Sequence, residues 1–129
     1  MAWCFTDEAT EFTETLLSRL SDLTDRALVP VLWLYEVINV AEVAVRKSRI
    51  TEEKASAFLE SLADLPIEIE NPTRPLVFAS VRTLASRYKL TGYDAAYLEL
   101  AIRHNLPIAS LDNALVQAAR AAGVDLVQL

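Results

Sequence analysis

Helical and strand-like periods of hydrophobic and polar residues follow one another along this chain. Apolar residues at a helical period predict amphipathic or buried helices, and short apolar or alternating runs predict strands. The predicted helices cover 6–22, 30–46, 51–65, 76–89, 91–104 and 113–122. The predicted strands cover 27–29, 66–70, 107–111 and 124–129. Strands interleaved with helices in this order are typical of an α/β fold with a mainly parallel sheet and helices on both faces.

Length and composition favour one domain over the whole of 1–129. A chain of 129 residues can bury a proper core, and 53% hydrophobic residues with two glycines favour regular structure. The formal charge of −6 gives no general attraction for nucleic acid, although a local basic surface can coexist with an acidic total.

The helix predicted at 30–46 is the most apolar part of the chain. Glu36, Asn39 and Glu42 lie inside it, which favours a buried core helix over a membrane span because charges within a bilayer are costly. We expect Glu36 and Asn39 to share one face with core valines. A buried glutamate needs a partner, which arginine or a metal ion could provide. An ordinary exposed position for Glu36 remains the alternative.

Two further acids frame the predicted helix 91–104 and the strand that follows it. Thr91 and Asp94 have the spacing of a capping box, and Asp112 falls just past the strand 107–111. Ligands of parallel α/β sheets bind at the carboxyl ends of the strands, so Asp112 stands where chemistry usually occurs. Both acids also have a structural interpretation, Asp94 in the capping box and Asp112 as the N-cap of the next helix.

Single copies of cysteine and histidine exclude several kinds of site. With Cys4 alone there is no disulfide framework or thiolate metal site, and a reducing cytoplasm is the expected compartment. His104 alone removes zinc sites that need several histidines and weakens any Ser-His-Asp scheme. No basic segment leads into an apolar one at the amino terminus, so we expect no signal peptide. Any chemistry must therefore rest mainly on carboxylates.

Three stretches together resemble a known family. LVPVLWLYEVINV at 28–40, LTGYDAAYLELAIRHNLPIASLD at 90–112 and ALVQAARAAGVDLV at 114–127 are similar to PIN-domain ribonucleases, specifically the VapC-type toxins of prokaryotic toxin–antitoxin pairs. The resemblance implies a three-layer α/β/α fold and hydrolysis of RNA with Mg²⁺ or Mn²⁺. It also implies an antitoxin protein as partner, a homodimer, a cytoplasmic location and no membrane association.

The resemblance assigns roles to five residues. Glu36 matches the acid on the helix after the second strand, Asp94 the acid that opens the later helix, and Asp112 the acid after the fourth strand. These three would be the catalytic and metal-binding acids, with Ser110 supporting the last acid and Asn39 a polar neighbour of the first. The chemistry agrees, because Mg²⁺ prefers oxygen ligands and can activate a water for attack on a phosphodiester.

The amino terminus departs from the family pattern. PIN domains ordinarily begin with a strand that ends in an aspartate, as in V-V-D-x-S, whereas MAWCFTDEAT reads as already inside the following helix. We therefore expect the first strand and its aspartate to be missing, which would remove a metal ligand and open strand edges. Met1 would then be an internal methionine, or the chain would be shortened. Asp7 and Glu8 lie in the helix and are poor substitutes.

Two other functions compete with the nuclease. A catalytically inactive PIN-like module that binds an antitoxin or itself is favoured by the missing strand and aspartate. A phosphoacceptor receiver-like domain also collects acids at strand ends, but it resembles a pattern that needs a lysine late in the chain. No lysine follows Lys89, so the receiver-like function ranks far below the other two.

Overall fold

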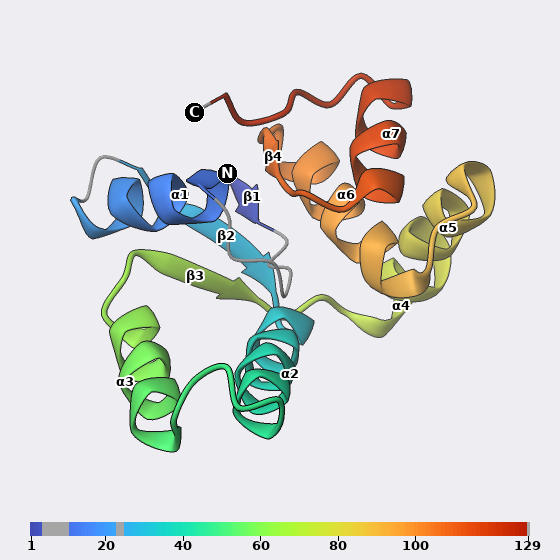
Figure 1. Cartoon of the computed structure of the whole chain (residues 1–129). Helices are drawn as coiled ribbons and strands as arrows, with labels where there is room; N and C mark the ends of the chain where they lie inside the picture. Colours follow the sequence, from blue (N-terminus) through green and yellow to red (C-terminus); the bar gives the residue numbers. More distant parts are fainter. Residues whose placement is uncertain (4–10, 23–24, 129) are drawn as a thin grey trace.

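A parallel sheet of four strands forms the middle of the molecule (Figure 1). The computed structural model describes residues 1–3, 11–22 and 25–128, and the statements that follow concern these residues. The strand order is β3-β2-β1-β4, with every pair parallel. The strands are β1 (Ala2–Trp3), β2 (Ala27–Pro30), β3 (Ile67–Glu70) and β4 (Ile108–Ala109).

Residues 2–3 form a strand, whereas the sequence predicted that the chain begins inside a helix. Ala2 pairs with Leu28 on one side and with Ile108 on the other, so β1 lies at the centre of the sheet. The amide of Ala2 donates to the carbonyl of Pro107 at 2.9 Å, and the amide of Leu28 donates to that of Met1 at 2.7 Å. A strand of two residues shows no period of its own. Its place is decided by backbone pairing with two distant segments.

The helices match most of the predicted positions and start at recognisable caps. Thr51 and Thr91 accept hydrogen bonds from the amides of Lys54 and Asp94, at 3.2 and 3.1 Å, which fixes the starts of two helices. The helices are α1 (Glu11–Ser21), α2 (Leu32–Arg46), α3 (Glu52–Ala63), α4 (Arg74–Leu76), the π-helical turn η1 (Val77–Val81), α5 (Arg82–Tyr88), α6 (Gly92–His104) and α7 (Asn113–Ala121). The predicted stretch 6–10 lies outside the described residues.

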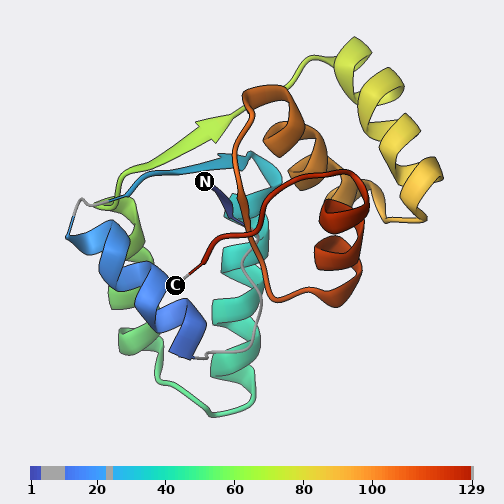
Figure 2. The ribbon, with the colours of Figure 1, turned by 90° about the horizontal axis from the view of Figure 1, so that it is seen from above.

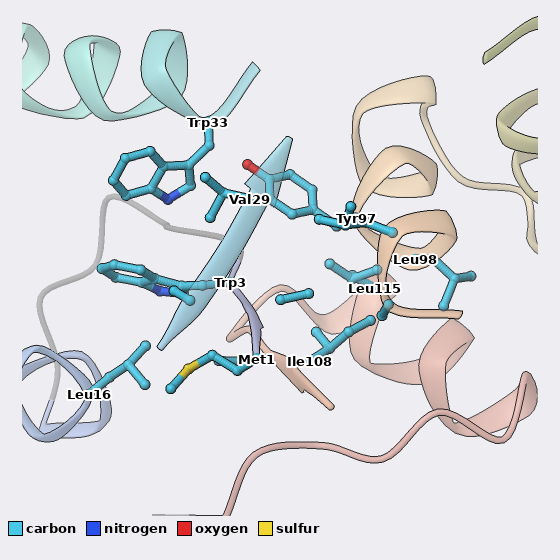
Figure 3. Close-up of a cluster of buried hydrophobic side chains, with 14 of the residues drawn as sticks. Met1, Trp3, Leu16, Val29, Trp33, Tyr97, Leu98, Ile108 and Leu115 are labelled. Atoms are coloured by element: carbon cyan, nitrogen blue, oxygen red, sulfur yellow. The ribbon is translucent and has the colours of Figure 1, made fainter. Parts of the chain in front are cut away.

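Helices cover both faces of the sheet, as the three-layer α/β/α prediction requires. Figure 3 shows Trp3, Trp33 and Leu16 on one side of β2, and Tyr97 with Leu115 on the other. The Trp3 and Trp33 rings lie 5.5 Å apart between centroids at a tilt of 51°, and both side chains are buried. Helices α1 and α2 therefore close one face, and α6 and α7 close the other.

Some predicted boundaries are wrong. Pro30 ends β2 instead of opening the next helix, and Pro75 lies inside α4 instead of in a turn. The predicted strand 124–129 is reduced within the described residues to one parallel bridge between Leu126 and Ile108. Proline is accepted both at the end of a strand and in the first turn of a helix, so the sequence alone left these positions open.

Helix α2 buries a different face from the one predicted. Its buried residues are Trp33, Val37 and Ala41, whereas Asn39 is exposed. Glu36 is partly buried at the border of that face. The prediction that Asn39 lies among core side chains is therefore wrong. None of the helices in the described part of the chain is long and apolar enough to span a membrane.

Candidate active site at the carboxyl edge of the sheet

The topology brings Glu36, Asp94 and Asp112 towards one edge of the sheet. Glu36 lies in the second turn of α2, six residues beyond the end of β2, and Asp112 lies three residues beyond the end of β4. Asp94 lies in the first turn of α6, the helix that returns to the amino end of β4. Because the strands are parallel, these positions share the edge where the strands end. All three side chains are partly buried.

Glu36 is held by a tyrosine from another helix. The hydroxyl of Tyr97, on α6, donates a hydrogen bond to Oε1 of Glu36, on α2, across 61 positions in the sequence. Burial raises the pKa of the Glu36 carboxyl, the Tyr97 hydrogen bond opposes that rise, and the charge of Asp94 adds to it. The Tyr97 ring is fully buried, so its hydroxyl is fixed by core packing. Tyr97 therefore sets the position of the Glu36 carboxylate.

Asp94 occupies the middle of the three acids. Its pKa is raised by burial and by the charge of Asp112, while a side-chain hydrogen bond with Thr91 lowers it. The charge of Asp94 in turn raises the pKa of Glu36, so Asp94 interacts electrostatically with both other acids. The predicted cap at Thr91 is confirmed, because its Oγ1 accepts from the Asp94 amide. The cap fixes the start of α6 and thereby the direction of Asp94.

Two hydrogen bonds, one to Ser110 before it and one from Leu115 after it, orient Asp112. Its Oδ2 accepts from the amide of Leu115 at 2.9 Å, so Asp112 is the N-cap of α7, as its structural interpretation predicted. Its own amide donates to Oγ of the buried Ser110 at 3.0 Å. Ser110 thus contacts the backbone of Asp112, and its role as a support of that acid in the site stays a prediction. Within the described residues Oδ1 of Asp112 makes no hydrogen bond and is available to a ligand.

Two other acids, the buried Glu99 and the partly buried Glu70, are paired with cations. Glu99 is 6% exposed and accepts from Nε of Arg103 at 2.8 Å. Arg103 also pairs with Glu70 at the end of β3, and His104 lies 2.5 Å from the same carboxylate. The hydrogen bond from Arg103 lowers the pKa of Glu70. The sequence left arginine open as a partner of Glu36. Arg103 on α6 pairs with Glu70 and Glu99 instead.

The three site acids have no such partner in the described part of the chain. None of Glu36, Asp94 and Asp112 forms an ion pair there. Nor do 1–3, 11–22 and 25–128 contain three acids, histidines or cysteines grouped tightly enough to enclose a metal ion. Mg²⁺ usually keeps several of its waters and needs only one or two direct carboxylates, so this looser arrangement fits such an ion. Asp7 and Glu8 lie outside the described residues.

The sequence singled out the three acids and Ser110, but not the hydroxyl of Tyr97 that contacts Glu36. The Tyr97 ring is part of the core, and its hydroxyl reaches Glu36. The signal was available, since a tyrosine one helical turn after Asp94 shares a face with it. Asn39 is exposed, and within the described residues its side chain makes no hydrogen bond. Its expected role beside Glu36 therefore stays a prediction.

The fold and the site together define a three-layer α/β protein with an acidic site beyond the ends of its parallel strands. The PIN-domain family model matches residues 2–121, which is nearly the whole chain. The protein therefore belongs to the PIN-domain family, whose members are generally nucleases that use divalent metal ions. Comparison with curated proteins finds no match.

Proposed function

We propose that this protein is a metal-dependent endoribonuclease, the toxin component of a VapC-type toxin–antitoxin pair. The observation that supports it is the arrangement of Glu36, Asp94 and Asp112. The charge of Asp94 raises the pKa of Glu36, the charge of Asp112 raises that of Asp94, and none of these partly buried carboxylates has a cationic partner among the described residues. Keeping such acids ionised together is unfavourable unless a cation binds between them.

The residues divide the work according to their contacts. Asp94 and the Oδ1 atom of Asp112 would hold Mg²⁺ or Mn²⁺, with Glu36 beside them. When bound, the ion supplies an activated water and neutralises charge on the leaving oxygen. Tyr97 is a positioning residue, because its hydroxyl fixes the Glu36 carboxylate. Ser110 and the Leu115 amide hold Asp112 in place. The cap engages Oδ2 of Asp112, which leaves Oδ1 for the ion.

Cleavage of a labelled single-stranded RNA with Mg²⁺, Mn²⁺ or EDTA tests the proposal. The wild type should cut internally only with metal, and Asp94→Asn should lower the rate by roughly 100-fold or more, because the central ligand charge is lost. Asp64→Asn is the matched control, since Asp64 is exposed at the end of α3. Equal cleavage by wild type and Asp94→Asn would remove Asp94 from the mechanism. A circular RNA substrate establishes internal cutting.

A catalytically inactive, protein-binding PIN module is the second candidate. It is favoured by the sequence after β1, where Cys4 follows the strand and no acid stands there. It is also favoured by the lack of a tight group of three ligands in the described part of the chain. Absence of metal-dependent cleavage by the wild type, together with capture of a specific partner, would support this candidate.

We also propose an antitoxin partner and a homodimer. Helix α2 exposes apolar side chains at Leu34, Tyr35 and Ile38, which are 44%, 69% and 50% accessible. A contiguous exposed apolar patch on a helix is a typical protein-contact surface. Light scattering after gel filtration should give twice the mass of 14.3 kDa for the isolated chain. A monomer at micromolar concentration would contradict the homodimer.

A further inference from the structure

The positive charge of this acidic protein is concentrated in one segment. The chain carries 12 lysines and arginines against 18 aspartates and glutamates. Residues 71–93 contain four of these cations and no acid, so the remainder of the chain carries 8 cations and 18 acids. The segment is therefore +4 and the remainder −10. A separation of this size creates a local positive field that the total charge conceals.

The segment forms an arm that projects from the body of the protein. Helix α4, the η1 turn and α5 follow one another without a break from Arg74 to Tyr88. Figures 1 and 2 both show this arm extending beyond α6, away from the strands. It packs mainly against α6, so its other side faces solvent. The four cations are all exposed: Arg74, Arg82, Arg87 and Lys89.

The solvent side of the arm combines cations with an exposed aromatic ring. Arg74, Phe78 and Arg82 follow one another at intervals of four residues, which places them along one side of the helix. Phe78 is 69% accessible, although it is among the largest apolar side chains. A hollow of about 600 Å³ is lined by Phe78, Ala79, Arg82, Thr83, Ser86 and Arg87. We call Arg74, Phe78, Arg82 and Arg87 the basic face.

The arginines of the basic face are not neutralised by the rest of the described chain. The ion pairs found there use Arg19, Arg103 and His104, and none involves an arginine of the arm. Unpaired arginines spread around an exposed aromatic ring are suited to a chain of phosphates whose bases can stack. The guanidinium group binds phosphate oxygens, and the ring accepts any base on its face.

The basic face leads to the candidate active site. A second hollow, of about 460 Å³, joins Phe78 and Arg82 to Gly92 at the start of α6. Tyr93 follows Gly92, is 69% accessible and directly precedes Asp94. Helices α5 and α6 are joined by a short turn and pack against each other, so the end of the arm lies at the acidic edge. A bound strand could thus run from Phe78 past Tyr93 to Asp94.

We infer that the basic face is the surface on which this protein binds single-stranded RNA and guides it to Asp94. The inference rests on the proposed nuclease function and adds where the substrate is held. The basic face supplies phosphate contacts through Arg82 and Arg87 and base stacking through Phe78. Sequence preference is weak on such a surface, because every base offers a stacking face and every nucleotide the same phosphate.

Fluorescence anisotropy of a labelled 20-nucleotide RNA in EDTA measures binding without cleavage. Replacing Arg82 and Arg87 together by glutamine should weaken binding roughly tenfold at moderate salt. It should also flatten the dependence of log K on log salt concentration by about 1.4, since each phosphate contact on a single strand contributes about 0.7. Phe78→Ala should weaken binding by about fivefold or more with an unchanged salt slope.

The control variant removes the same number of positive charges from a different part of the surface. Arg46→Gln with Lys47→Gln removes two exposed cations at the end of α2, away from the arm. This control should bind like the wild type. Lysine at both Arg82 and Arg87 should restore most of the salt slope, because the charges return. Circular dichroism of each variant excludes unfolding, which is not expected at exposed positions.

The outcomes distinguish failure of the proposed RNA-binding surface from failure of the proposed nuclease function. Equal loss of binding in the arm variant and in the α2 control, or no loss in either, overturns the inference even if the wild type cleaves RNA. A wild type that binds RNA through the arm but never cleaves it overturns the nuclease and leaves the surface standing. If the arm substitutions abolish binding of an acidic peptide and leave RNA affinity intact, the face serves a protein partner and the inference is wrong.

Discussion

The hydrogen bond between Tyr97 and Glu36 allows a sharp test of how the acidic site is supported. Tyr97→Phe deletes one hydroxyl and keeps the buried ring, so it opens no cavity in the core. A hydrogen bond to a charged group contributes about 1.5–3 kcal/mol, and removing the donor leaves a partly buried carboxylate with less compensation. The variant should lose that much of its free energy of unfolding at neutral pH.

The expected shift in melting temperature follows from the size of the chain. For 129 residues, 1 kcal/mol corresponds to roughly 3–5 °C, so Tyr97→Phe should melt about 5–15 °C lower. Differential scanning calorimetry or urea unfolding measures this directly. Tyr35→Phe is the matched control, because it removes the same atom from an exposed ring on α2 and should change stability by less than about 0.5 kcal/mol.

The pH dependence of the Tyr97→Phe effect has a definite sign. The hydrogen bond lowers the pKa of Glu36 against the raising effect of burial, so its removal raises that pKa further. The ionised carboxylate is the form that needs the donor. The destabilisation should therefore be largest above the folded pKa of Glu36. It should shrink as the pH falls and Glu36 becomes protonated, towards the roughly 1 kcal/mol of a neutral hydrogen bond.

A double-mutant cycle with Glu36→Gln isolates the contact. The two single variants and the double variant should show a coupling free energy of about 1 kcal/mol or more at neutral pH. Coupling below about 0.5 kcal/mol is what independent sites show. That result, or equal melting temperatures for wild type and Tyr97→Phe, would refute the argument that the tyrosine holds the glutamate.

Three further predictions follow from the site and the sheet. Asp94→Asn should raise the melting temperature in EDTA at pH 7 because burial and Asp112 raise the Asp94 pKa. Ionised Asp94 thus costs stability above its folded pKa, and the gain should vanish below about pH 4. Asp112→Ala should cost about 1 kcal/mol in urea unfolding through the lost N-cap, whereas Asp112→Asn should keep most of that stability and lose cleavage. Trp3→Ala should cost about 3–5 kcal/mol, because the ring is buried against Trp33 in the central strand. A cost below about 1 kcal/mol would contradict the placement of β1.

The pattern of side chains determined the class of fold. Alternating helical and strand-like periods predicted a parallel α/β sheet, and caps such as Thr51 and Thr91 located helix starts within a residue. These signals are local, because a cap or a helical face depends on residues within one or two turns. The acids could be singled out from local signals too, since Glu36 lies within an apolar helix, Asp94 lies in the first turn of a helix and Asp112 follows a strand.

Only the tertiary structure decided what those local signals left open. β1 exists because Ala2 finds backbone partners in two segments far along the chain, which no pattern within two residues can reveal. Tyr97 reaches Glu36 because α6 and α2 pack near the same end of β2. Helix α2 buries the face that carries Trp33, Val37 and Ala41, which leaves Asn39 in solvent. Long-range pairing and packing depend on all the elements together, so local sequence patterns could not predict these contacts.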